Sequence, residues 1–94
     1  MWYVYILKSL KDNQNYVGMS NDLKLRFKSH NDGKNFSTKH RRPFILLYYE
    51  AHNDKHDAAQ REKFLKTGWG KNWIQKTIKN YLYSQKVGRI NGKI

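Results

Sequence analysis

The chain has 94 residues, enough for one domain with a modest hydrophobic core. Nineteen Lys and Arg against seven Asp and Glu give a formal net charge of +12, which predicts binding to a polyanion such as a nucleic acid. The lack of cysteine excludes disulfides and thiolate sites, and the lack of a signal sequence or a run of roughly 20 apolar residues predicts a cytoplasmic protein without membrane contact.

The first predicted elements are two strands joined by a turn. In residues 3–18 (YVYILKSLKDNQNYVG) two apolar and aromatic runs flank the polar segment KDNQ, which indicates a β-hairpin. Tyr5 and Tyr16 are then neighbours on adjacent strands, either as core aromatics or as reactive phenols. Both alternating faces of the first strand are apolar or aromatic, which is typical of a central strand. One face carries Trp2, Val4 and Ile6, and the other carries Tyr3, Tyr5 and Leu7.

A helix is predicted next, from the capping residues 20–22 to His30, where the sequence NDG ends it. Leu23 and Phe27 form its apolar edge. Arg26 and His30, four residues apart, share another edge. This pair either contacts one phosphate or belongs to an ordinary solvated face.

Residues 34–43 (KNFSTKHRRP) are strongly basic, and their apolar residues follow neither a helical nor a strand period, so a loop is expected. The guanidinium group of an arginine can donate two parallel hydrogen bonds to phosphate oxygens, and hydroxyl groups can add further donors. The alternative is a solvated charge run. The candidate nucleic-acid contacts in this loop are Thr38, Lys39, Arg41 and Arg42.

A third strand is predicted over residues 44–49 (FILLYY), a short continuous apolar and aromatic run. Asn53 or Asp54 can cap the helix that follows. We expect that helix to reach Thr67 and to be closed by Gly68.

An acidic residue lies on the inward stripe of this helix. Ala58, Ala59 and Leu65 mark the stripe, and Glu62 falls on it by helical spacing. A carboxylate among apolar residues is costly unless a cation or hydrogen-bond donors meet it. Glu62 is therefore the candidate metal ligand, with an ion pair to a nearby Lys or Arg as the equal alternative.

A third amphipathic helix is expected over residues 69–83, behind a loop at Gly70. Trp69 and Trp73 either pack in the core, which we favour, or stack on bases. We expect a domain over residues 1–85 and a loose basic tail over 86–94. The apolar positions of the helix are Ile74, Ile78, Tyr81 and Leu82.

The order of these features resembles the GIY-YIG nuclease superfamily, in particular small stand-alone bacterial members similar to the N-terminal nuclease domain of the excision-repair C subunit. Residues 3–5 (YVY) match the first triplet, with Tyr3 in place of its glycine, and residues 16–18 (YVG) match the second. The helical arginine, the histidine and the metal-binding glutamate of the family fall on Arg26, His30 and Glu62, and Asn72 is a weak match to a late asparagine.

The resemblance implies an α+β fold, with a small three-stranded antiparallel sheet flanked by about three helices. It also implies a metal-dependent endonuclease that hydrolyses phosphodiester bonds of DNA, branched or damaged, in repair or recombination. One divalent cation, Mg²⁺ or Mn²⁺, would bind Glu62. The catalytic residues implied are Tyr5, Tyr16, Arg26, His30 and Glu62.

Two other classes of function stay open. The same basic surface suits a nucleic-acid-binding module without catalysis. A basic accessory protein of a ribosome or repair complex could bind its partner through Trp69, Trp73 and the tail. The inward Glu62 favours the nuclease, because a pure polyanion binder gains nothing from an acid that faces phosphate.

Overall fold

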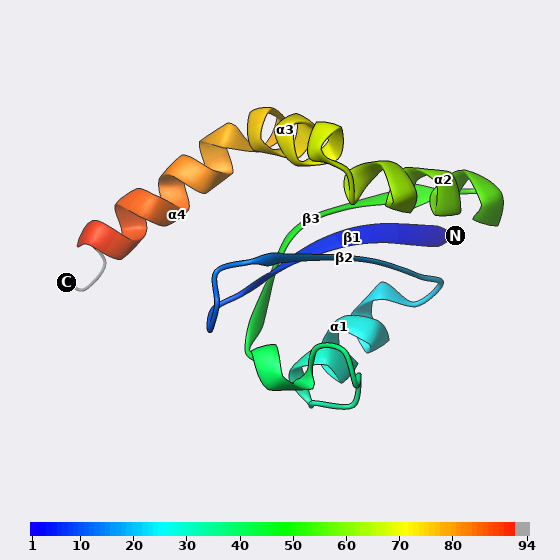
Figure 1. Cartoon of the computed structure of the whole chain (residues 1–94), viewed down its shortest axis with the longest axis horizontal. Helices are drawn as coiled ribbons and strands as arrows, with labels where there is room; N and C mark the ends of the chain where they lie inside the picture. The colour runs from blue at the N-terminus through cyan, green and yellow to red at the C-terminus, as the bar shows by residue number, and fades with distance from the viewer. Residues whose placement is uncertain (92–94) are drawn as a thin grey trace. The chain divides into compact units, whose positions relative to one another are not determined.

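The computed structural model describes the backbone of residues 1–91 and the side chains of residues 1–86. The chain forms two compact units, one ending at Lys63 and the other beginning at Phe64. Figure 1 shows the elements, which are, in chain order, β1 (Trp2–Ser9), β2 (Asn15–Ser20), α1 (Leu23–Asn31), the 3-10 turn η1 (Lys39–Arg41), β3 (Phe44–His52), α2 (Lys55–Leu65), α3 (Gly68–Thr77) and α4 (Lys79–Asn91).

The three strands form an antiparallel sheet in the order β2-β1-β3, which confirms β1 as the central strand. Residues 4–7 of β1 are all buried, because α1 covers the Tyr5 face and α2 covers the Trp2 face (Figure 1). On the second face the Lys55 amine lies 4.9 Å from the centre of the Trp2 ring. The predicted α+β class is confirmed, with four α-helices in place of about three.

Strand β3 contains a bulge that changes which of its residues face α1. Tyr48 pairs with Ile6 but Leu46 pairs with Leu7, so one extra residue of β3 lies between the two pairs. Leu46 therefore lies on the Tyr5 face although the alternation from Tyr49 would place it on the other face. The bulge explains why this strand reads as a continuous apolar run without a clear period of two.

The helix starts follow local capping. Asp22 caps α1 through a hydrogen bond from the Leu25 amide, as expected, and Asp54 accepts the amides of His56 and Asp57 at the start of α2.

The predicted end of α2 at Thr67 and Gly68 is wrong. The helix ends at Leu65. The Thr67 side chain instead accepts the Gly70 amide and caps α3, so Gly68 opens a helix and Gly70 lies inside one. Ala58 is buried in α2, but Ala59 is exposed and does not belong to the inward stripe.

The second unit holds two helices, α3 and α4, where the sequence predicted one. Ile74 is buried, but Trp69 is 78% exposed, so the expectation that it packs in the core is wrong. Helix α4 continues through Asn91, where we expected a loose tail from residue 86, because one glycine inside a helix costs only about 1 kcal/mol. Residues 92–94 lie outside the described residues.

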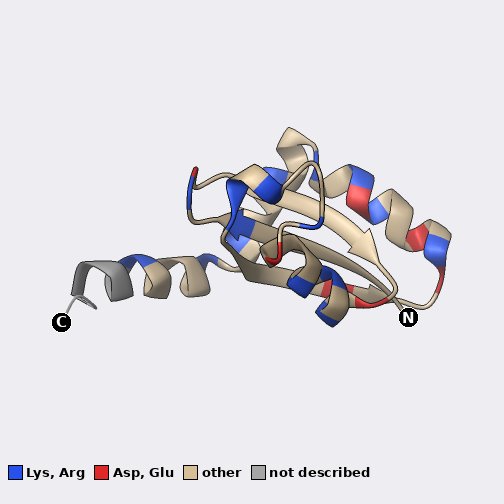
Figure 2. Cartoon of the chain, turned by 90° about the horizontal axis from the view of Figure 1, so that it is seen from below, with Lys and Arg blue, Asp and Glu red and all other residues tan. Residues whose placement is uncertain are grey.

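Positive charge is distributed over the helices and loops and is not gathered in one segment (Figure 2). Within the described part of the chain, no helix has both the length and the apolar character needed to cross a bilayer.

The two glycines at the start of α3 allow a matched stability test. A Cβ at Gly70 would meet backbone atoms of Phe64 and Leu65, the nearest of Leu65 at 2.5 Å, whereas a Cβ at Gly68 would meet nothing within 4 Å. We expect Gly70→Ala to lower the free energy of unfolding by about 1–3 kcal/mol through overpacking. Gly68→Ala should leave it unchanged or raise it by up to about 1 kcal/mol. Urea unfolding followed by circular dichroism measures both, and equal effects would contradict the close approach at Gly70.

Candidate active site

Tyr5 lies at the centre of the candidate site, in a space that Gly18 leaves open. The two residues pair across β1 and β2, and the Tyr5 side chain is only 1% exposed. A Cβ at Gly18 would lie 2.5 Å from Cζ of the Tyr5 ring, closer than real side chains approach. The glycine that follows Tyr16 and Val17 is thus a steric requirement of Tyr5.

The Tyr5 hydroxyl is joined to His30 of α1, and His30 is joined to Thr38. The distance from Tyr5 Oη to His30 Nε2 is 2.8 Å, and that from His30 Nδ1 to Thr38 Oγ1 is also 2.8 Å. All three side chains are at most 1% exposed. They form a buried hydrogen-bonded chain, which we call the Tyr5–His30–Thr38 chain.

Burial, followed by the positive charge of Arg26, lowers the pKa of His30 below its ordinary value of 6.5. The imidazole is therefore neutral near pH 7, with one ring nitrogen as donor and the other as acceptor. The hydroxyls of Tyr5 and Thr38 can each match either role, so together they satisfy both nitrogens. Such a pair of partners fixes the orientation of the ring.

Tyr16 lies beside the same histidine. Its ring centre is 5.0 Å from that of His30 and 6.5 Å from that of Tyr5, and it is only partly buried. The structure thus brings both predicted tyrosines and the predicted histidine together.

Burial raises the pKa of Tyr5 to about 12, the nearby Tyr16 adds to the rise, and the charge of Arg26 opposes it. In the protein alone burial outweighs Arg26, because the hydroxyl is shielded from water. Tyr5 is a neutral phenol at neutral pH.

Arg26 and Glu62 complete the set of predicted catalytic residues. Arg26 is exposed on α1, one turn before His30, and acts electrostatically on both Tyr5 and His30. Glu62 is half-buried on α2, near enough for its charge to raise the pKa of Tyr5 slightly. An exposed guanidinium and a carboxylate thus act on the same phenol from two different helices.

Sequence reasoning missed the residue that anchors α2. Glu50 of β3 accepts a hydrogen bond from Arg61 Nε at 2.5 Å and another from Tyr48 at 2.8 Å. Burial opposes ionisation of Glu50, but the bonds from Arg61, Tyr48 and His52 hold its pKa below the ordinary value. Because Arg61 precedes Glu62, this ion pair fixes the part of α2 that carries the candidate metal ligand. The only sequence signal was an acid within an apolar strand.

Among the described residues no three His, Asp or Glu side chains gather as a metal-binding cluster. A cation at Glu62 would thus have fewer than three such ligands among the described residues, with water and phosphate filling the remaining positions. Mg²⁺ is commonly held in this way, so the donor set at Glu62 fits such an ion.

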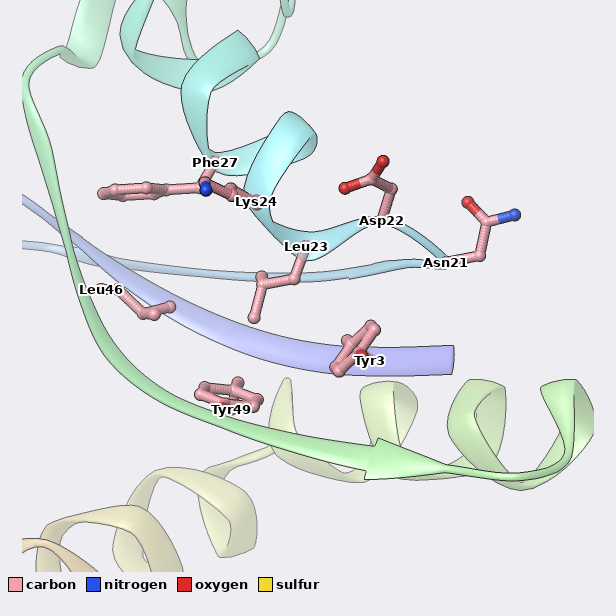
Figure 3. Close-up of a pocket in the computed structure, with 8 residues that line it drawn as sticks. All are labelled: Tyr3, Asn21, Asp22, Leu23, Lys24, Phe27, Leu46 and Tyr49. Atoms are coloured by element: carbon pink, nitrogen blue, oxygen red, sulfur yellow. The ribbon is translucent and has the colours of Figure 1, made fainter. Parts of the chain in front are cut away.

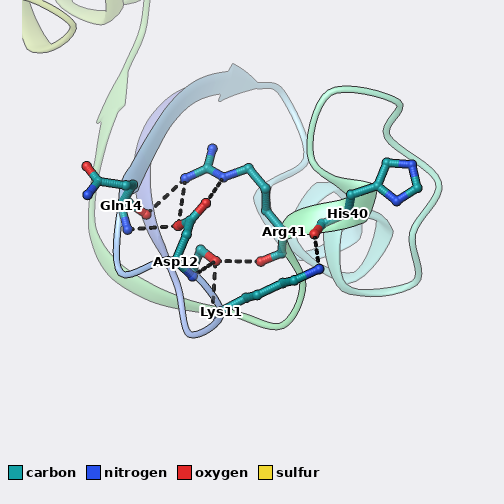
Figure 4. A network of polar contacts seen from close by, with 6 residues as sticks. Lys11, Asp12, Gln14, His40 and Arg41 are labelled. Atoms are coloured by element: carbon teal, nitrogen blue, oxygen red, sulfur yellow. Dashed lines mark hydrogen bonds and ion pairs between the residues drawn. The ribbon is translucent and has the colours of Figure 1, made fainter.

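The basic loop differs from its predicted role at two of its four residues. Thr38 is fully buried against His30 and is not a surface phosphate contact, so that prediction is wrong. Arg41 is committed to the hairpin turn, where its Nε lies 2.7 Å from Asp12 Oδ2 (Figure 4). Lys39 is half-buried and Arg42 is exposed, and both stay predicted contacts.

The loop is fastened to the turn at several points (Figure 4). Ser9 Oγ donates to the Arg41 carbonyl at 2.6 Å and accepts the amides of Lys11 and Asp12 at 3.1 Å each. The Lys11 amine donates to the His40 carbonyl at 2.9 Å. These bonds hold the end of the segment that supplies Thr38 to His30.

Likewise, His30 is not a solvated residue that contacts phosphate beside Arg26. It is 1% exposed and its two ring nitrogens bond to protein hydroxyls. Of the two, only Arg26 lies at the surface, where it can meet a ligand.

Comparison with known proteins gives the family. The model of the GIY-YIG catalytic domain matches residues 1–81. The chain belongs to the GIY-YIG family. The resemblance carried by the two tyrosine triplets is thereby confirmed, and so is the fold class, since a relative of solved structure has the same fold.

The relatives of this GIY-YIG chain are small bacterial proteins. It is 45% identical over 65 residues to the UPF0213 protein YazA of Bacillus subtilis, covering 68% of this chain and 65% of that protein. It is 44% identical over 66 residues to the UPF0213 protein SH2523 of Staphylococcus haemolyticus, covering 69% of this chain and 79% of that protein. The solution NMR structure of the UPF0213 protein BH0048 from Bacillus halodurans matches with a TM-score of 0.52 and 33% identity, over 83% of this chain and 86% of that one.

The steric role of Gly18 is open to a double-mutant test. We expect Gly18→Ala to destabilise the protein by about 1–3 kcal/mol, because the buried Tyr5 ring has little room to move. Tyr5→Leu shortens the opposing side chain, so the cost of Gly18→Ala should shrink in that background. Denaturant unfolding of the four proteins gives the coupling energy, and a value near zero would contradict the contact.

Acid should destabilise the protein through His30. Its pKa is lowered in the folded state, so below about pH 6.5 the unfolded chain binds a proton that the folded protein does not. Stability is therefore full above pH 6.5 and falls as the pH drops toward the folded pKa, with a slope of at most about 1.4 kcal/mol per pH unit. The midpoints of urea unfolding, measured between pH 8 and pH 5, give this pH dependence of stability. His30→Gln should flatten the profile, whereas His40→Gln, at an exposed residue, should not.

Proposed function

We propose that this protein is an endonuclease that hydrolyses phosphodiester bonds of DNA and depends on a divalent metal ion. One observation carries the proposal: the buried phenol of Tyr5 lies within the electrostatic influence of Tyr16, Arg26 and Glu62 and is hydrogen-bonded to His30. These groups have the types that phosphodiester hydrolysis needs, namely a proton acceptor, a cationic group and a metal ligand. Membership in the GIY-YIG family supports the same reaction class.

Arg26 is suited to hold the phosphate. Its side chain is exposed, and a guanidinium contacts two phosphate oxygens at once. Its positive charge would stabilise the negative charge that develops on those oxygens during hydrolysis. The same charge is the largest influence that lowers the pKa of Tyr5, so one side chain would act on both the phosphate and the phenol.

The tyrosines are suited to position the attacking water and to accept its proton. Tyr5 has a pKa of about 12 in the protein alone, so it is protonated at neutral pH and is a poor base by itself. His30 holds the Tyr5 hydroxyl in one orientation through the 2.8 Å bond. Tyr16, partly exposed beside them, is the second candidate for contact with the water.

Glu62 is the residue that would hold the cation, Mg²⁺ or Mn²⁺. A bound cation supplies positive charge next to the phosphate and lowers the pKa of its water. The half-buried Glu62 carboxylate, held on α2 by the neighbouring ion pair of Arg61, would supply the single protein ligand. We propose DNA as the substrate, with branched and damaged forms of repair and recombination as the forms to test first.

The proposal predicts that Glu62→Gln abolishes cleavage without unfolding the protein. Supercoiled, branched and single-stranded DNA are incubated with and without Mn²⁺, and products are separated on gels. Glu62→Gln and Arg26→Ala should each lower the rate by about 100-fold or more, and Tyr5→Phe by nearly as much if the hydroxyl does chemistry. Asp57→Asn, an exposed change on the same helix, is the control and should retain the rate.

Retained metal-dependent activity in Glu62→Gln would contradict the metal assignment. A protein that binds every DNA form but cleaves none, with or without Mn²⁺, would favour the non-catalytic binding module, which the charge of +12 supports independently.

A further inference from the structure

A groove of about 440 Å³ lies between α1 and the end of the sheet. It falls in the size range of small-ligand sites, about 300–1,000 Å³. Figure 3 shows α1 residues on one side and residues of β1 and β3 on the other. We call it the tyrosine groove, and its lining residues are Tyr3, Asn21, Asp22, Leu23, Lys24, Phe27, Leu46 and Tyr49.

The walls of the tyrosine groove have the chemistry of a base-binding surface. Tyr3 and Tyr49 contact each other with ring centres 6.0 Å apart and planes tilted by 60°, and Tyr49 is 52% exposed. The exposed part of the Tyr49 side chain offers aromatic surface to a further planar group. Leu23 and Phe27 add apolar surface, and the polar side chains of Asn21, Asp22 and Lys24 also line the groove.

The polar side chains that line the groove suit a nucleotide. Lys24 can pair with a phosphate, and Asn21 can both donate to and accept from a base edge. The Asp22 carboxylate already accepts the Leu25 amide at 3.1 Å and so is held in place as an additional acceptor. Lys24 and the apolar side chains of the groove are together complementary to a nucleotide, which has an anionic phosphate and an apolar planar base.

The groove adjoins the candidate active site on the same face of the sheet. Tyr3 and Tyr5 are two residues apart on β1, so their side chains are separated by about 7 Å along the strand. On α1, Lys24 and Phe27 line the groove while Arg26 acts on Tyr5. A phosphate held at Arg26 would therefore bring its neighbouring base within reach of the groove.

We propose that the tyrosine groove binds one unpaired nucleobase of the substrate strand, stacked on Tyr49 beside the phosphate to be cleaved. The proposal rests on the nuclease function proposed above and deepens it. A base within a duplex is stacked on both faces and paired along its edge, so it must leave the stack to enter a groove. The protein should therefore prefer single-stranded ends, loops or junctions over continuous duplex.

The test measures DNA binding in EDTA, so that no cleavage occurs. A short single-stranded oligonucleotide carries the fluorescent base 2-aminopurine, and the same sequence is also supplied as a blunt-ended duplex. Stacking on Tyr49 should quench the 2-aminopurine emission of the single strand on binding. Tyr49→Leu should weaken single-strand binding by about 5- to 150-fold, the usual effect of losing one base–aromatic stack, and should abolish the quenching.

Matched variants separate stacking from charge and from folding. Tyr49→Phe keeps the ring and should bind and quench like the parent. Tyr83→Leu removes another exposed tyrosine, on α4, and should have no effect. Lys24→Gln should weaken binding and lower the salt slope for the single strand by about 0.7, whereas Tyr49→Leu should leave the slope unchanged.

Several results would overturn the groove assignment. One is that Tyr49→Leu and the parent bind the single strand with equal affinity. Another is that Tyr49→Leu loses as much affinity for the duplex as for the single strand. A third is that Tyr49→Leu loses self-association of the protein and not its binding to DNA. The two proposals fail separately. A parent protein that cleaves DNA while Tyr49→Leu binds single strands normally contradicts only the groove, and a parent that quenches 2-aminopurine but never cleaves contradicts only the nuclease.

Discussion

The hydroxyl of Tyr5 is buried, and a buried hydroxyl costs free energy unless it is hydrogen-bonded. His30 meets this requirement from α1, and Thr38 in turn meets the second nitrogen of His30. The Tyr5–His30–Thr38 chain therefore joins the central strand, the first helix and the basic loop. Gly18 is the fourth partner, because only a residue without a side chain admits the ring. The geometry of the site is the consequence of satisfying one polar group in the middle of the sheet.

The bulge in β3 places Leu46 and Tyr49 on the same face of the sheet. Leu46 and Tyr49 lie on the α1 side, while Tyr48 and Glu50 lie on the α2 side, where Glu50 binds Arg61. A regular strand with the Tyr49 register would turn Leu46 away from the groove. Because the Arg61 contact holds α2 one residue before Glu62, the same strand contributes to the groove and to the placement of the candidate metal ligand.

Local patterns predicted the central strand, the hairpin and the Asp22 cap, because each depends on neighbours in sequence. They failed where tertiary contacts determine the position of a residue or the start of a helix. Thr38 lies among basic residues and reads as a surface donor, and only the fold reveals that His30 is its partner. Gly68 is a common helix-ending residue, but the cap by Thr67 makes it the start of α3. That Arg26 and Glu62 both influence the pKa of Tyr5 could not be predicted from spacing, because spacing alone does not bring two helices to one strand.

Charge is divided between the surface and the interior of the candidate site. Arg26 is exposed and permanently charged, whereas the buried Tyr5 and His30 are neutral at pH 7, because burial raises the pKa of one and lowers that of the other. The formal charge of +12 can therefore attract a polyanion without changing the protonation of the Tyr5–His30–Thr38 chain. In the proposed nuclease, salt concentration would therefore act through the surface cations, whereas pH would act through the buried phenol and imidazole.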